Sequence, residues 1–374
     1  MKINPLSDVF SRPQISKPIS FEDFFECGRC AFVYGAGSAG EDVVKLLVSK
    51  SIRISNIIDF KIAKKKILGI DIINPDDSSI SFIDRKLITV FIGIFNSSVN
   101  IISLRESLYE IGYTQIVDFT ELHSWFPDIL GTRYWLTDRS FYSNYTSDII
   151  STYDLWSDNK SKFIYHELIN FRLTGRPIDT ISEGQYFPLD LSACKLPLSI
   201  IDCGAFTGDT IREICKLGLP LAKLAAFEPE PVNYNALINE IKKANFDNTE
   251  VYTWPCGVYS STVQLKFNSG FGPSSHISSD GDISVPCVAL DDVAFGLAPN
   301  FIKMDIEGAE FAALQGAKEI IKKYRPRLAI CLYHNPEDIW IIPNLISAWN
   351  LNYSLHIRVH GYSGLETVLY AIPQ

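Results

Sequence analysis

The feature that most constrains this chain is an apolar run that leads into a glycine-rich turn. The run begins at Ile200 and continues into Asp202-Cys203-Gly204-Ala205-Phe206-Thr207-Gly208-Asp209. An apolar stretch that ends in such a turn predicts a buried strand, and Thr210 to Leu217 predicts the following helix, ended by Gly218 and Pro220. A strand, a glycine turn and a helix in this order predict an open α/β sheet with a ligand at the turn.

Two carboxylates bracket the turn and indicate what kind of ligand it holds. Turns of this type usually hold pyrophosphate on backbone N–H groups, and Asp202 and Asp209 would repel that anion. A ligand without phosphate and with positive character, such as the sulfonium and ammonium of S-adenosylmethionine, is compatible with both acids. The alternative is an ordinary turn in which Asp209 lies favourably near the positive end of a helix.

A second apolar run supports the ligand-binding alternative. Leu224 to Phe227 predicts a short strand that ends at Glu228, which lies 20 residues after Gly208. A carboxylate at the tip of the second strand can accept hydrogen bonds from both ribose hydroxyls of an adenosine. The two features agree on a ligand that contains adenosine.

Further segments occur in a fixed order around these two. They are Gln185 to Pro188, Phe227-Glu228-Pro229, Val288 to Asp292 and Ile302 to Glu310. With the glycine turn, this series resembles the class I methyltransferases, and more closely the FkbM family, whose members methylate hydroxyl groups of natural products and sugars. The resemblance spans residues 150 to 374 and implies S-adenosylmethionine as the cofactor.

The resemblance also implies which residues contact that cofactor. The contacts would come from the segment before the first strand, from the glycine turn and from the ends of the later strands. The expected cofactor-binding residues are Tyr186, Asp202, Gly204, Ala205, Thr207, Gly208, Asp209, Glu228, Cys256 and Asp305.

Methyl transfer to oxygen needs a group that accepts the hydroxyl proton. His334, just after a predicted fifth strand at 327–332, is the leading general base, because the pKa of imidazole lies near neutral pH. An equal alternative is that His334 caps the following helix or bonds an interdomain carboxylate. Asp305 and Glu307 could orient the hydroxyl and the base, or bind a divalent cation with His334 or Asn335. We assign no metal ligand from this pattern alone.

The remaining pattern predicts the architecture of the second half of the chain. Residues 196–374 are expected to form a doubly wound class I methyltransferase sheet that ends in an antiparallel hairpin, Tyr353 to Val359 with Glu366 to Ile372. A further hairpin is expected at 263–267 and 283–288. The loop between its strands contains Ser274, Ser275 and His276, which could contact substrate or form a solvated turn.

The first part of the chain predicts a smaller α/β domain at residues 21–120. Cys30 to Tyr34 is a strand, Gly35 to Gly40 matches G-x-G-x-x-G, and Asp59 follows 19 residues later. The domain resembles small Rossmann-like modules that hold a nucleotide-linked sugar or serve as scaffold. The alternative function is therefore a nucleotide-sugar or NAD(P)-binding oxidoreductase or binding protein. Its ligand residues would be Gly35, Gly37, Gly40 and Asp59.

Composition and spacing complete these expectations. Residues 1–20 predict an irregular leader and residues 121–195 a helical, aromatic connecting region. The net charge of −9 argues against a nucleic-acid partner. There is neither an 18-residue apolar run nor a signal-peptide pattern, so we expect a cytoplasmic protein with reduced cysteines, a small-molecule or glycan substrate and no membrane partner. A homo-oligomer is compatible with the composition, and the pair Cys27 and Cys30 is interpreted as structural.

Overall fold

The computed structural model describes residues 5–11, 21, 30–60, 66–75, 77, 79–244, 246, 248–268, 276–277 and 283–374. Most of the predicted leader, Cys27, Ser274 and Ser275 lie outside these residues, and of His276 only the backbone is described. Across the described part, no helix combines the length and apolarity needed to cross a membrane.

The chain divides into two compact units. The first unit comprises Met1–Tyr153, Phe163–Ile181 and Gly361–Leu365, and the second comprises Asp154–Lys162, Ser182–His360 and Glu366–Gln374. The connecting region predicted at 121–195 is therefore not a separate layer, because its residues are shared between the two units.

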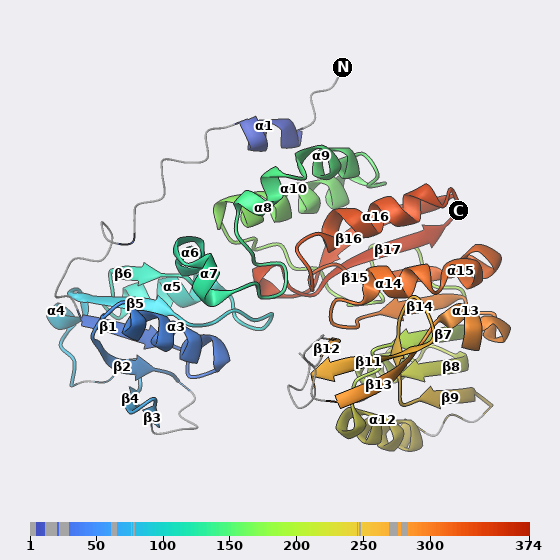
Figure 1. The fold of residues 1–374 in the computed structure, drawn as a ribbon, viewed down its shortest axis with the longest axis horizontal. Helices are drawn as coiled ribbons and strands as arrows, with labels where there is room; N and C mark the ends of the chain where they lie inside the picture. Colours follow the sequence, from blue (N-terminus) through green and yellow to red (C-terminus); the bar gives the residue numbers. More distant parts are fainter. Residues whose placement is uncertain are drawn as a thin grey trace. The chain divides into compact units, whose positions relative to one another are not determined.

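The first unit is built on an open, mostly parallel sheet, as predicted (Figure 1). Its strand order is β3-β4-β2-β1-β5-β6. The strands are β1 (Cys30–Tyr34), β2 (Ile54–Ile58), β3 (Lys66–Ile67), β4 (Ile70–Ile73), β5 (Ile88–Ile92) and β6 (Gln115–Val117). Of these, β3 pairs antiparallel with β4, an addition that the sequence pattern did not predict. Alternate residues of β1 and β5 pack with Leu108 and Ile116 in one apolar core.

Two helices of the first unit follow strands directly: α3 (Ser38–Ser49) follows β1, and α5 (Ile101–Glu110) follows β5. α3 buries Val43, Val44, Leu46 and Leu47, the apolar stripe expected from the sequence. Further helices complete the unit. They are α1 (Pro5–Ser11), α4 (Phe82–Arg85), α6 (Phe119–Trp125), α7 (Pro127–Leu130), α8 (Ser140–Ser143), α9 (Thr146–Tyr153), most of α10 (Asn159–Thr174) and the 3-10 turn η3 (Tyr362–Gly364).

The second unit contains a seven-stranded sheet of order β16-β17-β15-β14-β7-β8-β9 (Figure 1). β7 (Leu198–Cys203), β8 (Leu221–Phe227), β9 (Glu250–Trp254), β14 (Phe301–Met304) and β15 (Arg327–Cys331) run parallel. β16 (Tyr353–Val359) and β17 (Thr367–Pro373) pair antiparallel, which confirms the predicted terminal hairpin. Chain order reverses between β7 and β14, so the carboxyl ends of these strands border the crevice where ligands gather in such sheets.

A smaller four-stranded sheet has the order β10-β13-β11-β12. β11 (Val263–Asn268) and β13 (Ile283–Val288) pair antiparallel, which confirms the second predicted hairpin. β10 (Gly257–Val258) and β12 (His276–Ile277) complete it. This sheet places Val285 and Cys287 of β13 next to the end of β9.

The helices of the second unit are α11 (Asp209–Lys216), α12 (Pro231–Ala244), α13 (Leu290–Val293), η2 (Phe295–Leu297), α14 (Glu310–Gln315), α15 (Lys318–Tyr324) and α16 (Asp338–Ala348). The sequence predicted one helix at 309–324, whereas the structure has α14 and α15. A Cβ at Gly316 would lie 2.2 Å from the Tyr259 carbonyl oxygen, so the chain turns there against another backbone segment. Asp291 then caps α15 by accepting N–H bonds from Glu319 and Ile320, at 3.0 and 2.8 Å.

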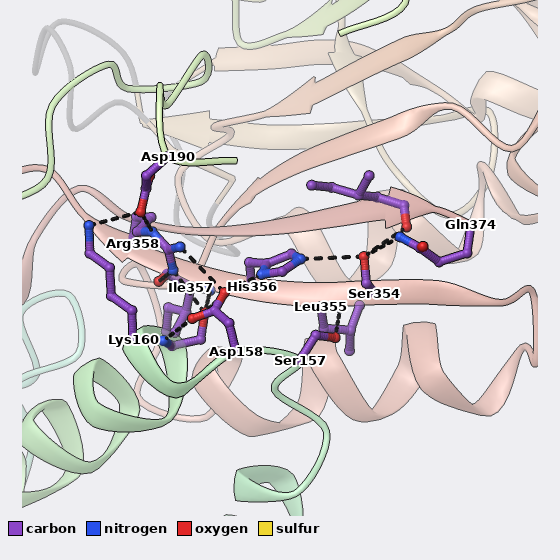
Figure 2. Close-up of polar contacts among 12 residues, drawn as sticks. Ser157, Asp158, Lys160, Asp190, Ser354, Leu355, His356, Ile357, Arg358 and Gln374 are labelled. Carbon is purple, nitrogen blue, oxygen red and sulfur yellow. Dashed lines mark hydrogen bonds and ion pairs between the residues drawn. The ribbon is translucent and has the colours of Figure 1, made fainter. Parts of the chain in front are cut away.

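A polar cluster covers the outer edge of β16 (Figure 2). Ser157 exchanges two hydrogen bonds of 2.9 Å with the backbone of Leu355. Asp158 contacts the His356 ring and the Arg358 guanidinium, and Arg358 Nε donates to Asp190 Oδ2 at 2.9 Å. Arg358 is only 2% exposed, so the two carboxylates neutralise a buried cation.

Candidate active site

A cavity of about 270 Å³ lies in the second unit at the carboxyl ends of its parallel strands. Its walls come from segments that follow β7, β8, β9, β14 and β15, together with the smaller sheet and the start of β17. The lining residues are Gln185, Tyr186, Gly204, Phe206, Asp209, Phe227, Glu228, Pro229, Asn233, Cys256, Gly257, Val258, Val285, Cys287, Asp305, Ile306, Glu307, Ala309, Tyr333 and Glu366.

The glycine turn after β7 forms one wall, and its geometry requires glycine. Gly204 has φ +77°, and a Cβ there would lie 1.9 Å from the Asp305 carbonyl oxygen. The turn therefore contacts the end of β14 directly. Asp209, the first residue of α11, lines the cavity and also lies at the positive end of that helix, so both sequence interpretations of this carboxylate agree with its position.

Glu228 lies at the end of β8, as predicted, and holds the turn in place. Its Oε2 accepts the Phe206 N–H and its Oε1 accepts the Glu230 N–H, both at 2.9 Å. Each carboxylate oxygen has a second lone-pair direction, so both can still accept a hydroxyl donor from the cavity. Burial raises the pKa of Glu228, and the two N–H groups act in the opposite direction.

Asp202 lies beneath the turn and does not line the cavity. It is fully buried, and its Oδ1 is 3.1 Å from the Nζ atom of Lys303 on β14. Lys303 Nζ also donates to the Gly204 carbonyl at 2.6 Å. Burial opposes the charge on Lys303, but Asp202, Asp305 and Asp209 outweigh burial and raise its pKa. Asp202 therefore acts on the turn through Lys303 rather than by touching a cofactor.

The other predicted cofactor residues fall into two groups. Tyr186, Gly204, Asp209, Glu228, Cys256 and Asp305 line the cavity. Ala205, Thr207 and Gly208 form the backbone of the turn and do not line it. Gly208 packs instead against Glu240, whose side chain would be 3.0 Å from a Cβ at that position.

Asp305, another residue of the cavity wall, accepts hydrogen bonds from two tyrosines. Tyr186 Oη donates to Asp305 Oδ2 at 2.8 Å and Tyr333 Oη donates to Oδ1 at 3.3 Å. Gln185 Nε2 reaches both the Tyr186 hydroxyl, at 3.2 Å, and Glu366 Oε2, at 2.9 Å. These contacts fix the side chains on this wall before any substrate enters.

His334 lies behind this wall and does not line the cavity. Its Nδ1 is 2.9 Å from Glu310 Oε1, and its Nε2 is 3.4 Å from Asp305 and 3.6 Å from Glu307. Burial lowers the pKa of His334, but Glu310, Glu307 and Asp305 raise it further, so the net shift is well upward. The ring is therefore an imidazolium held by three carboxylates. This position differs from that of a general base in contact with the acceptor.

Glu307 lies between His334 and the cavity. It has φ +54°, a strained value for this residue type, and its carboxylate lines the cavity. Burial raises the pKa of Glu307 to about 8, although the charge of His334 acts in the opposite direction. Glu310 holds the loop that carries Glu307 by accepting the N–H groups of Ile306 and Gly308, at 2.8 and 3.1 Å.

Asp305, Glu307 and His334 each offer an atom within 4.8 Å of the others, which is close enough to hold a cation. A metal-ligating imidazole has to be neutral, whereas the surrounding carboxylates hold His334 protonated. The side chains fit a carboxylate-bound imidazolium better than a divalent metal.

Sequence reasoning missed several residues of the cavity. Asn233, on α12, and Glu366, just before β17, were not singled out, and both line it. Tyr333 adjoins His334 and was visible in the same segment. Glu366 lies 61 residues after Asp305 in the chain. Only the pairing of β17 with β15 brings it to the cavity.

The predicted N-terminal ligand residues gather at the ends of β1 and β2. Gly35 has φ +106°, and the Ala36 N–H donates to Asp59 Oδ2 at 2.9 Å. A Cβ at Gly40 would lie 2.0 Å from the Gly35 oxygen, so Gly40 allows α3 to pack on the turn. A Cβ at Gly37 would meet no atom within 4 Å. Asp59 thus holds its turn as Glu228 holds the turn of the second unit.

The parallel sheet with its terminal antiparallel hairpin, and the cavity at the carboxyl ends of its strands, define a protein with a class I methyltransferase fold. Residues 202–362 match the family model described as the methyltransferase FkbM domain. This match confirms the resemblance found in the sequence for this part of the chain.

A solved structure supports the fold over nearly the whole chain. The crystal structure of the methyltransferase FkbM from Methylobacillus flagellatus KT is similar to this chain, with a TM-score of 0.73 and 20% sequence identity. The similarity covers 92% of this chain and 90% of the other. Comparison with curated proteins found no match.

Proposed function

We propose that the second unit transfers a methyl group from S-adenosylmethionine to a hydroxyl group of a sugar, a glycoconjugate or another small hydroxylated metabolite. The observation that carries this proposal is that a single cavity is lined both by Glu228 and Asp209, beside the glycine turn, and by Glu307 and Asp305. We assign the first pair to the cofactor and the second pair to the acceptor.

The first pair fits the cofactor. Glu228 would accept hydrogen bonds from the ribose hydroxyls, and Cys256 and Val258 offer an apolar surface for the adenine. Asp209 would attract the positive amino and sulfonium groups. S-adenosylmethionine, when bound, supplies a methyl group on a positively charged sulfur.

The second pair fits the acceptor hydroxyl. A neutral hydroxyl is a poor nucleophile, so its proton has to be taken as the new bond forms. We assign this role to the Glu307 carboxylate, because Glu307 lines the cavity whereas His334, the base expected from the sequence, lies behind it. Asp305, fixed by two tyrosines, would orient the hydroxyl. The positive charge of His334 would stabilise the negative charges of Asp305 and Glu307.

The experiment that tests the proposal is isothermal titration with S-adenosylhomocysteine. Wild-type protein should bind with micromolar affinity, and Glu228→Ala should lose that binding while its circular dichroism spectrum stays unchanged. Glu213→Ala is the matched control, because Glu213 lies on α11 of the same unit and its carboxylate pairs with Lys216. Equal affinity of Glu228→Ala and wild type would refute the assignment of Glu228.

A further inference from the structure

We propose that the acceptor is an uncharged, polyhydroxylated compound that carries no phosphate or carboxylate group near the reacting hydroxyl. This inference rests on the proposed function and adds the charge class of the substrate. It follows from the composition of the cavity wall together with the partners of the cations behind that wall.

The ionisable side chains that the described residues contribute to the cavity wall are mostly acidic, and none is basic. Five carboxylate side chains line it, and no lysine, arginine or histidine side chain does so among the described residues. The five are Asp209, Glu228, Asp305, Glu307 and Glu366. The proposed function assigns Asp209 and Glu228 to the cofactor, whose own positive charge they would offset. Asp305, Glu307 and Glu366 are then left for the acceptor.

The cations nearest Asp305 and Glu307 are buried and already paired. Lys303 is 1% exposed and contacts Asp202 and the Gly204 carbonyl. The His334 side chain is 2% exposed and contacts Glu310 on the side away from the cavity. Neither cation has a surface on the cavity with which to meet an anionic substrate.

The same wall is well suited to hydroxyl groups. Carboxylate oxygens accept O–H donors, and the amide of Gln185 and the hydroxyl of Tyr333 are neutral hydrogen-bonding groups on the same surface. Asp305 is fixed by Tyr186 and Tyr333, and Glu366 is fixed by Gln185. A compound with several neighbouring hydroxyls could therefore donate to more than one of these acidic side chains. A phosphate or a second carboxylate would instead meet the Asp305 carboxylate, and none of the described residues of the wall offers it a cation.

The test uses wild-type protein and matched acceptor probes. Methyl glucoside, methyl glucuronide and glucose 6-phosphate, with the corresponding galactose and mannose series, are assayed for methyl transfer from labelled S-adenosylmethionine. We expect the neutral member of any reactive series to exceed its anionic partners in kcat/KM by about 100-fold or more, the size expected for a close like-charge contact. A phosphorylated or carboxylated probe that reacts as well as its neutral partner would overturn the proposal.

A binding measurement decides the question even if none of these sugars reacts. Protein saturated with S-adenosylhomocysteine is titrated with inorganic phosphate and with acetate at constant ionic strength. We expect no saturable binding of either anion below about 10 mM. The inference would be refuted by saturable binding that the control Glu213→Gln retains and that Glu366→Lys strengthens. These two results together would place the anion beside Glu366. Failure of S-adenosylhomocysteine itself to bind would instead refute the proposed function.

Discussion

Glu307 Oε2 lies 3.6 Å from His334 Nε2, and of the two residues only Glu307 reaches the cavity. This pair places the His334 ring behind the carboxylic acid that lines the cavity. In the proposed reaction, the charge of the ring would act on the acceptor through Glu307 and Asp305. The role of each residue can be separated by substitution.

Replacing Glu307 with Gln should lower kcat by about 100-fold or more, the usual contribution of a positioned proton acceptor, because the amide cannot take the hydroxyl proton. Affinity for S-adenosylhomocysteine should stay within about twofold of wild type, since we assign Glu307 to the acceptor. Steady-state kinetics and isothermal titration provide the two readouts. Glu319→Gln, on the surface of α15, is the control. Retention of more than a tenth of wild-type kcat would contradict the assigned role.

Replacing Lys303 with Met should destabilise the protein by about 3–5 kcal/mol, because it leaves the Asp202 carboxylate buried without a partner. Urea unfolding measures the loss. The double variant Lys303→Met with Asp202→Asn should recover part of it, because the amide does not need a counter-charge. Lys216→Met, at an exposed ion pair, should cost less than about 1 kcal/mol. Additive effects of the two core substitutions would argue against a coupled pair.

Replacing Gly204 with Ala should abolish S-adenosylhomocysteine binding. A methyl group at this position would lie 1.9 Å from the Asp305 carbonyl, so the turn or the end of β14 has to move. Gly218→Ala is the matched control: Gly218 has φ +61°, and a Cβ there meets no atom within 4 Å. The control carries the same conformational strain without the clash. If Gly204→Ala binds S-adenosylhomocysteine as tightly as Gly218→Ala does, the turn can accommodate a methyl group and the prediction is wrong.

The polar cluster on β16 should contribute a measurable pH dependence to stability. Burial raises the pKa of Asp158, but hydrogen bonds from His356 and Ser161 and the charge of Arg358 outweigh it and lower the pKa to about 2. Because the folded-state pKa lies below the unfolded value, the stabilisation is complete above about pH 4 and is lost as the pH falls toward 2.

Urea unfolding of wild type and Asp158→Asn at several pH values isolates this contribution. Wild type should be the more stable protein at pH 5, and the difference should shrink between about pH 4 and pH 2. Asp154→Asn, in the same segment but outside the polar cluster, is the control. Its free energy of unfolding should differ from that of wild type by the same amount at each pH. A constant difference for Asp158→Asn would rule out the proposed ionic contribution.

Turnover should not depend on a divalent metal. Because an imidazolium occupies the position that a cation would take between Asp305 and Glu307, dialysis against a strong chelator should leave kcat unchanged, as should later addition of Mg²⁺. Activity that disappears with the chelator and returns with Mg²⁺ would contradict this expectation.

The sequence predicted the residues beside the glycine turn better than it predicted Glu366. The reason is the separation along the chain of the residues that form each contact. The Gly204 turn and Glu228 are specified by local strand–turn–helix chemistry and a spacing of 20 residues, and the structure brings them together. Glu366 reaches the cavity through strand pairing, which local patterns do not encode.

Burial is the second quantity that the sequence does not show. Asp202 lies near the end of β7 and His334 follows β15, yet both face buried partners, Lys303 and Glu310, rather than the cavity. The break between α14 and α15 has the same origin, because Gly316 contacts Tyr259 from a distant segment. In each case the residue type indicated a special position in the chain, but only the tertiary fold determined which residues surround it.

The contacts of residues 157–161 with β16 also bear on how this protein behaves in concentrated solution. Leu355 and Ile357 direct backbone groups away from the sheet, and Ser157 and Ser161 satisfy them. A strand with such groups satisfied cannot recruit a strand from another molecule. Damage to this segment should therefore appear first as slow aggregation of the purified protein, while the chemistry of the distant cavity continues in the molecules that remain in solution.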